Sequence, residues 1–312
     1  MANLFFRASE DALDNITEAF DIVHPLRASV RFTRKTLNEH FSGVNNVDDI
    51  ACQQLIDSDM YIHGVNYQRA FFEKTFDDYE ERLAWMLLNN LFAIHEGWID
   101  RLYSEFFDNQ GYNKKTFQKN LEYESLLTKM STYFVPNAKK SMALTNAFFT
   151  LYQNKSHLDF TKLDNYMLCY RYFKEARNCY MHKNFIASQQ LIGAYNNFMQ
   201  IATTSDLDVS EVPITIPPRL NQPVEISIRG VIGFSQIVQR IIIICDAYLL
   251  THQLAEKEIY NRRYDAWKLR PLSRDAVAAK KQVTRYCTKS GLLNPVQSTD
   301  FYNLLIRVGV FS

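Results

Sequence analysis

The stretch from Asp78 to Phe107, DYEERLAWMLLNNLFAIHEGWIDRLYSEFF, decides the fold class. Its large apolar residues recur at steps of three and four, which is the spacing of one face of an α-helix. These residues are Leu83, Leu87, Leu91, Ile94, Trp98, Leu102 and Phe106. The stretch therefore predicts a core helix of roughly seven turns or more, at about 3.6 residues per turn. The Asn109-Gln110-Gly111 sequence is expected to close it.

The composition of the whole chain also favours an α-rich fold. Hydrophobic residues make up 47% of the 312 residues, which is ample for a buried core and argues against a disordered chain. Only 9 Gly and 8 Pro are present, so long helices fit better than many short strands. The formal net charge is +1, so the overall charge indicates neither a nucleic-acid nor a membrane partner.

The sequence predicts a cytoplasmic protein without a membrane span. Residues Met1–Arg7 lack the basic start and long apolar stretch of a signal peptide. The longest apolar run, Ile241–Cys245, is flanked by Arg240 and Asp246 and is far short of a span. The 5 Cys are scattered without CxxC spacing, which argues against disulfides and a zinc site and fits a reducing compartment. We expect no metal and no cofactor.

The chain is expected to divide into three parts. Residues 1–202 form a helical domain. Residues 203–229 contain four prolines and two short alternating runs, Val212–Ile216 and Val224–Ile228, which predict a linker with a small β-hairpin. Residues 230–312 predict a helical, basic C-terminal region, either a separate domain or packed on the first.

Within the first part, residues 7–42 predict one or two amphipathic helices. A break is expected near His24–Pro25, because the residue before a proline is pushed out of the helical region. A second long helix is expected over 164–185, and a third over 188–201. In the C-terminal region, Gly291–Pro295 predicts a break between helices.

The chemical signal of the chain lies in Glu175–Phe185, EARNCYMHKNF. It resembles the motif of the HEPN superfamily, in which an Arg, commonly followed by a small polar residue, precedes a His by four to six residues. Here four residues separate Arg177 from His182, and the polar residue is Asn178. The resemblance implies a helical hairpin core, with the helix around Trp98 preceding the motif helix. Residue identity matches about one helix, and the architecture matches loosely.

The predicted helix separates an apolar face from a polar stripe. At about 100° per residue, the apolar residues lie within about 60° of Ala176. They are Cys169, Phe173 and Tyr180. The polar stripe is expected to face away from this core, with Arg177 on its flank. It contains Arg171, Glu175, Asn178 and His182. The resemblance implies that two such stripes meet across a homodimer and form a shared cleft.

The resemblance also implies a metal-independent RNA endonuclease. His182 would move the proton of an RNA 2′-hydroxyl, and Arg177 would stabilise the charged phosphate. Asn178 would orient the imidazole or contact the phosphate, and Glu96 on the preceding helix would be a secondary polar group near His182. The products would carry 2′,3′-cyclic phosphate and 5′-hydroxyl ends. Similar proteins act as toxins or anti-phage effectors, some with a neutralising protein partner. A tyrosine two residues after the His marks a toxin subgroup regulated by adenylylation; Asn184 stands there, so this regulation is not expected.

A second pair with the same spacing is set aside as a solvated helix face, whereas a structural role for His182 remains open. Arg34 and His40 also have the Arg-to-His spacing, but Lys35 occupies the polar position. His182 could merely satisfy carbonyls at the end of its helix. In that case the chain would be a non-catalytic HEPN-like protein that binds a protein partner or a nucleotide through its dimer surface.

The C-terminal tail carries a second, weaker signal. Lys280, Lys281 and Arg285 are predicted to bind RNA phosphates. Aromatic residues that could stack on bases are interleaved with the basic ones, namely Tyr260, Tyr264, Trp267 and Tyr286. The alternative is an ordinary helix with solvated charges and buried aromatic rings.

Overall fold

The computed structural model describes residues 4–44, 47–56, 66–108, 114–122, 126, 139–264 and 267–312. The regular structure of these residues is helical, and their β-type pairing is limited to two isolated bridges. The predicted mostly-α class is confirmed. The expected helix end at residues 109–111 lies outside the described residues.

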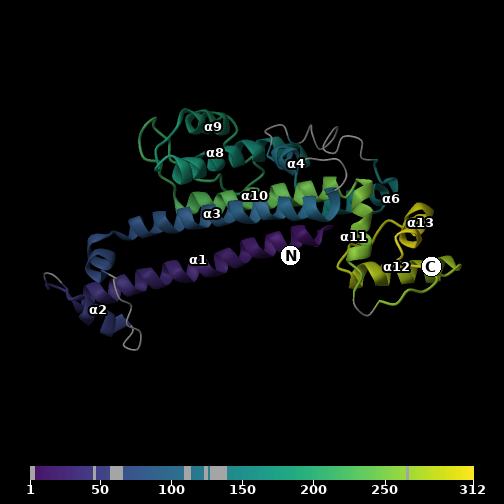
Figure 1. Cartoon of the computed structure of the whole chain (residues 1–312), viewed down its shortest axis with the longest axis horizontal. Helices are drawn as coiled ribbons and strands as arrows, with labels where there is room; N and C mark the ends of the chain where they lie inside the picture. Colours follow the sequence, from purple (N-terminus) through teal and green to yellow (C-terminus); the bar gives the residue numbers. More distant parts are fainter. Residues whose placement is uncertain are drawn as a thin grey trace.

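Three long helices set the long axis of the molecule, and two more pack on them (Figure 1). The long helices are α1 (Arg7–His40), α3 (Phe76–Leu102) and α10 (Ile228–Leu249). α8 (Leu163–His182) packs on α10 and α3, and α9 (Gln189–Met199) packs on α8. The chain thus forms a layered helical bundle rather than a simple hairpin.

Short helices gather at the two ends of this bundle (Figure 1). At one end, α2 (Asp49–Ile56) and the π-helical turn Arg69–Glu73 lie near the end of α1. Near the other end lie α4 (Lys114–Leu121), α6 (Met142–Leu144), α7 (Thr150–Ser156), α11 (Glu256–Asn261), α12 (Ala276–Lys289) and α13 (Thr299–Arg307). Gly291, with φ +76°, lies in the predicted break between α12 and α13.

The predicted core helix is present as α3. It begins with a capping box: the hydroxyl of Thr75 accepts from the N–H of Asp78 at 3.1 Å, and the Asp78 carboxylate accepts from the N–H of Thr75 at 2.7 Å. Such reciprocal bonds satisfy donors that a helix start otherwise leaves unpaired. After Leu102 the helix continues as a π-helical turn to Phe107, so the periodic stretch is helical throughout.

The predicted break at Pro25 is wrong, because α1 is continuous through it. A proline removes one N–H of the helix and therefore leaves the carbonyl four residues earlier, on Asp21, without its usual donor. Both Asp21 and Pro25 lie on the exposed side of α1, where water can replace the missing donor. The buried side of the helix, with Ala12, Ile16 and Ala19, keeps its contacts with the core.

The predicted β-hairpin in 203–229 is also wrong. The start of the second run pairs with residues 185–186 and not with the first run. The N–H of Val224 donates to the carbonyl of Phe185 at 2.7 Å, and Ile186 forms an isolated bridge with Pro223. The first run packs on the start of α10, where the carbonyl of Ile214 lies so close to Gly230 that a Cβ would be 2.1 Å from it. Each run is therefore held by a neighbouring helix or turn rather than by the other run.

α10 belongs to the same core as the first helices. One continuous cluster of buried apolar residues extends from Leu4 to Phe311. By length and composition alone α10 could cross a membrane, because it has 22 residues and its most apolar window has a mean hydropathy of 1.5. However, 61% of its most apolar window is buried inside the fold, as in the core helix of a soluble protein.

Candidate functional site

The motif lies on the last turns of α8. The helix ends at His182, three residues before the predicted end. The reason is local: Asn184 and Phe185 both have positive φ, at 49° and 68°, and reverse the chain. The N–H of Phe185 donates back to the carbonyl of Cys179 at 3.1 Å, which satisfies one of the last carbonyls of the helix.

An aromatic cluster holds this reversal in place. A positive φ is unfavourable for a bulky side chain and persists only where the surroundings enforce it. The ring of Phe185 packs edge-on against Tyr180, with centroids 4.5 Å apart, and against Trp85 of α3 at 6.4 Å. The guanidinium of Arg82 lies 5.5 Å from the centroid of the Phe185 ring. The position of His182 is therefore set by packing between α3 and the end of α8.

α3 and α8 run antiparallel. Early in α8, the hydroxyl of Tyr170 lies 3.2 Å from Nδ1 of His95. Near its end, the ring of Tyr180 stacks on Trp85, with centroids 4.5 Å apart. The order along the chain is thus reversed between the two helices, although a long segment separates them in sequence.

The core face of α8 is wider than predicted. Cys169, Phe173 and Ala176 are buried, as expected, and Tyr180 is half-buried. The expectation that Glu175 faces outward is wrong: only 7% of it is exposed, and it forms a salt bridge with Arg171 at 2.8 Å. The buried face is wider because α8 packs against α9 as well as α10 and α3. The outward stripe is reduced to Arg171, Asn178 and His182.

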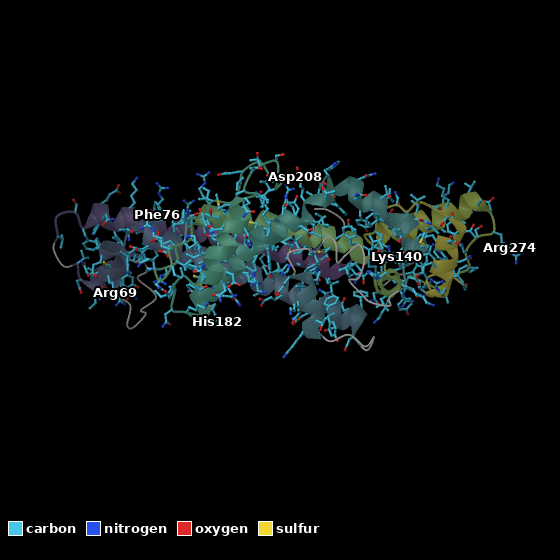
Figure 2. The ribbon with its side chains drawn as sticks, turned by 90° about the horizontal axis from the view of Figure 1, so that it is seen from above. Arg69, Phe76, Lys140, His182, Asp208 and Arg274 are labelled. Atoms are coloured by element: carbon cyan, nitrogen blue, oxygen red, sulfur yellow. The ribbon has the colours of Figure 1, made fainter. Side chains whose placement is uncertain are left out.

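The proposed catalytic residues lie at different depths. His182 is exposed (Figure 2), Asn178 is half-buried, and Arg177 is half-buried on the flank of the stripe. The Nε atom of Arg177 is inaccessible to solvent and has no hydrogen-bond partner in the described part of the chain. His182 follows Arg177 by five positions, which corresponds to about 7.5 Å along the axis of α8 and about 140° around it, at 1.5 Å and 100° per residue. The two side chains therefore leave the last turns of α8 in different directions, and the Nε of Arg177 has no hydrogen-bond partner among the described residues.

A buried polar cluster farther back on α8 was missed by the sequence argument. His95 is fully buried, and burial lowers its pKa to about 3, so its ring is neutral. It faces Tyr170, while Lys174 pairs with Glu122 nearby. Burial, and then the negative charges of Glu122 and Glu96, raise the pKa of the Tyr170 hydroxyl. Helical periodicity could not reveal this cluster, because its members come from separate segments.

Glu96 belongs to this cluster and not to the end of α8. It lies close enough to Tyr170 to influence its pKa. Tyr170 precedes His182 by twelve residues, or about 18 Å of helix. The expected approach of Glu96 to His182 is therefore wrong, because the antiparallel register places it near the other end of α8.

The basic tail lies far from the motif. Lys280, Lys281 and Arg285 are all exposed on α12, at the opposite end of the bundle from the end of α8 (Figures 1 and 2). Two of the aromatic residues expected to stack on bases are buried instead. Trp267 and Tyr286 pack edge-on with centroids 5.0 Å apart, and only 8% and 0% of them is exposed.

The alternative pair of Arg34 and His40 lies on α1. Arg34 donates to the carbonyl of Ala70 at 3.4 Å and lies over the ring of Tyr79, so its guanidinium is engaged. His40 is the exposed last residue of the helix. The pair is not part of the α3–α8 contact.

Two further findings bear on the site. All five cysteines are free and buried, so no disulfide braces it. Across the described ranges, no group of three or more His, Cys, Asp or Glu side chains could hold a metal ion. No family model, no curated protein and no solved structure matches the chain.

Proposed function

We propose that this protein is a metal-independent RNA endonuclease of the HEPN type. The observation that supports this most is the state of Arg177, whose buried Nε has no hydrogen-bond partner within the described part of the chain, while the exposed His182 follows on the same helix. A half-buried guanidinium without an anion is costly, because it loses hydration without gaining an ion pair. An incoming phosphate would supply the missing anion in a planar, bidentate geometry.

The reaction needs only groups from the chain and the RNA. The neutral imidazole of His182 takes the proton of the 2′-hydroxyl, and the oxygen attacks the adjacent phosphorus. The bond from phosphorus to the 5′-oxygen breaks, and that oxygen takes a proton from the imidazolium of a second His182 or from water. Arg177 stabilises the extra negative charge on the phosphate in the transition state. The products are a 2′,3′-cyclic phosphate and a 5′-hydroxyl.

The active site would be shared between two copies of the chain. The outward stripe of Arg171, Asn178 and His182 offers little enclosure on one subunit. A two-fold axis beside it brings two copies of each group together, excludes water, and supplies a second imidazole to protonate the leaving oxygen.

The same resemblance suggests the biological setting. We propose a cytoplasmic toxin or anti-phage effector, held in check by a neutralising or regulatory protein. The five free thiols fit a reducing compartment.

The test is cleavage of total RNA or tRNA by the purified protein, with and without excess EDTA. Cleavage that survives the chelator and leaves cyclic phosphate ends is expected. Activity that is lost in EDTA and restored by a divalent ion would reject the mechanism. No cleavage at any protein concentration would favour the non-catalytic alternative.

A further inference from the structure

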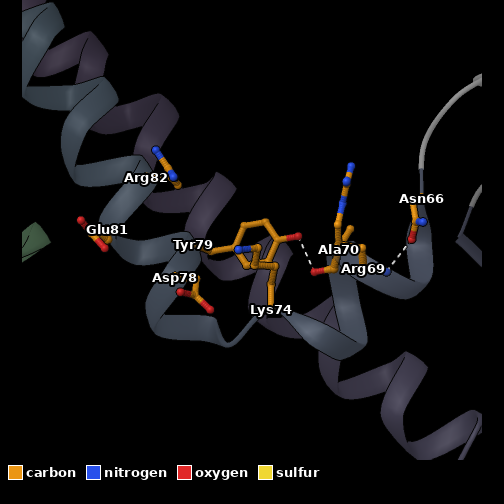
Figure 3. Close-up of a pocket in the computed structure, with 8 residues that line it drawn as sticks. All are labelled: Asn66, Arg69, Ala70, Lys74, Asp78, Tyr79, Glu81 and Arg82. Atoms are coloured by element: carbon orange, nitrogen blue, oxygen red, sulfur yellow. Dashed lines mark hydrogen bonds between the residues drawn. The ribbon is translucent and has the colours of Figure 1, made fainter. Parts of the chain in front are cut away.

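A cavity of about 390 Å³ lies beside the first turns of α3. Its size is within the range of pockets that hold small ligands or parts of larger ones. Most of its lining comes from the π-helical turn and the start of α3, shown in Figure 3. The lining residues are Asn66, Arg69, Ala70, Lys74, Asp78, Tyr79, Glu81 and Arg82.

The cations of this cavity form no salt bridge with the residues that the structure describes, whereas its acids accept hydrogen bonds. Within the described ranges, no salt bridge involves Arg69, Lys74 or Arg82. The Asp78 carboxylate accepts from the N–H and hydroxyl of Thr75, and Glu81 accepts from the indole N–H of Trp85 at 3.3 Å. Three cations against two occupied carboxylates leave a net positive cavity.

The arrangement of the cations suits an anion with several oxygens. In Figure 3 the side chains of Arg69 and Arg82 rise on either side of Tyr79, whose hydroxyl donates to the carbonyl of Ala70. Arg34 of α1 adds a fourth positive charge close to the cavity, because it contacts two of the lining residues, the carbonyl of Ala70 and the ring of Tyr79. Guanidinium groups bind phosphate through paired N–H bonds, which makes a phosphate the anion of choice.

The cavity is coupled to the candidate active site through one shared residue. Arg82 lines the cavity and also lies over the ring of Phe185, which follows His182 by three residues. The basic residues of the tail have no such connection, because they lie at the other end of the molecule (Figure 2). Phosphates next to the cleaved one would meet this cavity before they could reach α12.

We infer that this cavity binds backbone phosphates of the RNA strand whose scissile phosphate lies at Arg177 and His182. The inference deepens the proposed function and rests on it for the identity of the ligand. The cavity would hold the strand beside the cleavage point and fix its direction across the end of α8. Phosphate contacts of this kind position a nucleic acid without reading its sequence.

The experiment measures RNA binding, not cleavage. A fluorescent single-stranded RNA is titrated with full-length His182→Ala protein, with and without the double substitution Arg69→Glu and Lys74→Glu. The control carries Lys119→Glu and Lys155→Glu, which make the same charge change at exposed residues of α4 and α7. Circular dichroism and the melting temperature check that all three proteins are folded.

The cavity variant should bind at least about tenfold more weakly than the control. Its slope of log K against log salt should fall by about 1.4, because single strands contribute about 0.7 per neutralised phosphate. Equal binding by the cavity variant and the control overturns the inference, as does an absence of RNA binding by the parent protein. If AMP binds in a manner that depends on Arg69 and Lys74 while RNA binding does not, the cavity is a nucleotide site instead.

These outcomes are separable from those of the nuclease test. RNA binding that depends on the cavity, in a protein that never cleaves, would reject the nuclease and keep the phosphate site. If the protein cleaves RNA but the substitutions Arg69→Glu and Lys74→Glu do not weaken RNA binding, only the phosphate site is rejected.

Discussion

Tyr180 of α8 stacks on Trp85 of α3 with ring centroids 4.5 Å apart and planes inclined by 21°. This contact joins the two antiparallel helices within the last turn of α8. Phe185 packs on both rings, so the stack also supports the chain reversal after His182. The candidate active site is thus built on a packed aromatic cluster, although His182 itself is exposed.

Trp85→Ala should therefore be strongly destabilising. Trp85 is fully buried, and truncating a buried aromatic residue costs roughly 3–5 kcal/mol. Tyr180→Phe keeps the stack and should change the free energy of unfolding by less than about 1 kcal/mol. Urea denaturation measures both. Similar losses for the two variants would mean that the hydroxyl of Tyr180, rather than the ring contact, supports this region.

Arg177→Ala and His182→Ala should each abolish RNA cleavage or growth toxicity without a loss of helicity. They remove charge stabilisation and proton transfer, which are typically worth two or more orders of magnitude in rate. His40→Ala is the matched control, because His40 also ends a helix and is exposed. Inactivation by His40→Ala but not by His182→Ala would show that the wrong pair was chosen.

Replacing Lys280, Lys281 and Arg285 of the exposed tail with Glu tests the second RNA surface. If α12 contacts phosphates, RNA binding should weaken and its salt dependence should decrease. The distance of α12 from His182 implies that any such effect is on binding and not on the rate of the chemical step. Unchanged RNA binding at low salt would mean that these residues belong to an ordinary solvated helix face.

Specific activity should fall on dilution through the dimer dissociation constant. The outward stripe offers little enclosure within one subunit, so the isolated chain should be inactive. Light scattering and a dilution series of cleavage rates measure the two quantities together. A monomer with full activity at every concentration would rule out a shared site.

The stability of the fold should depend on pH through Asp246. Burial raises the pKa of this carboxyl to about 7, although it accepts from the N–H groups of Phe5 and Phe6. The folded chain therefore binds a proton that the unfolded chain has lost above about pH 4. The free energy of unfolding should fall as the pH rises from about 4 to 7, by roughly 4 kcal/mol for this group alone.

Asp246→Asn isolates this contribution. Burial lowers the pKa values of His95 and His252, so these two groups make the free energy of unfolding rise with pH. They do so equally in the parent protein and in the variant. In the variant, the free energy of unfolding should therefore no longer fall between about pH 4 and 7 because of residue 246. The variant can be less stable at every pH, because Asn has one acceptor oxygen where Asp has two. Parallel pH profiles for the two proteins would show that the carboxyl ionises in the same way in the folded and unfolded chain.

The sequence by itself determined the three helices α3, α8 and α9, to within a few residues at their ends. Periodicity along α3 and the signals around α8 and α9 depend on neighbouring residues, so they were readable without the fold. The start of α9 was recognisable for the same reason, since Ser188 accepts from the N–H of Leu191. The Arg177-to-His182 spacing is likewise a property of one helix.

Only the tertiary structure decided which residues meet. The buried environment of Glu175, the distance of Glu96 from His182, and the separate partners of the two runs in 203–229 depend on helices far apart in sequence. The same holds for the cavity beside α3, whose connection to His182 passes through Arg82 and Phe185. Periodicity gives the face of a helix, but the packing partner decides whether that face is buried, because burial is a property of two surfaces.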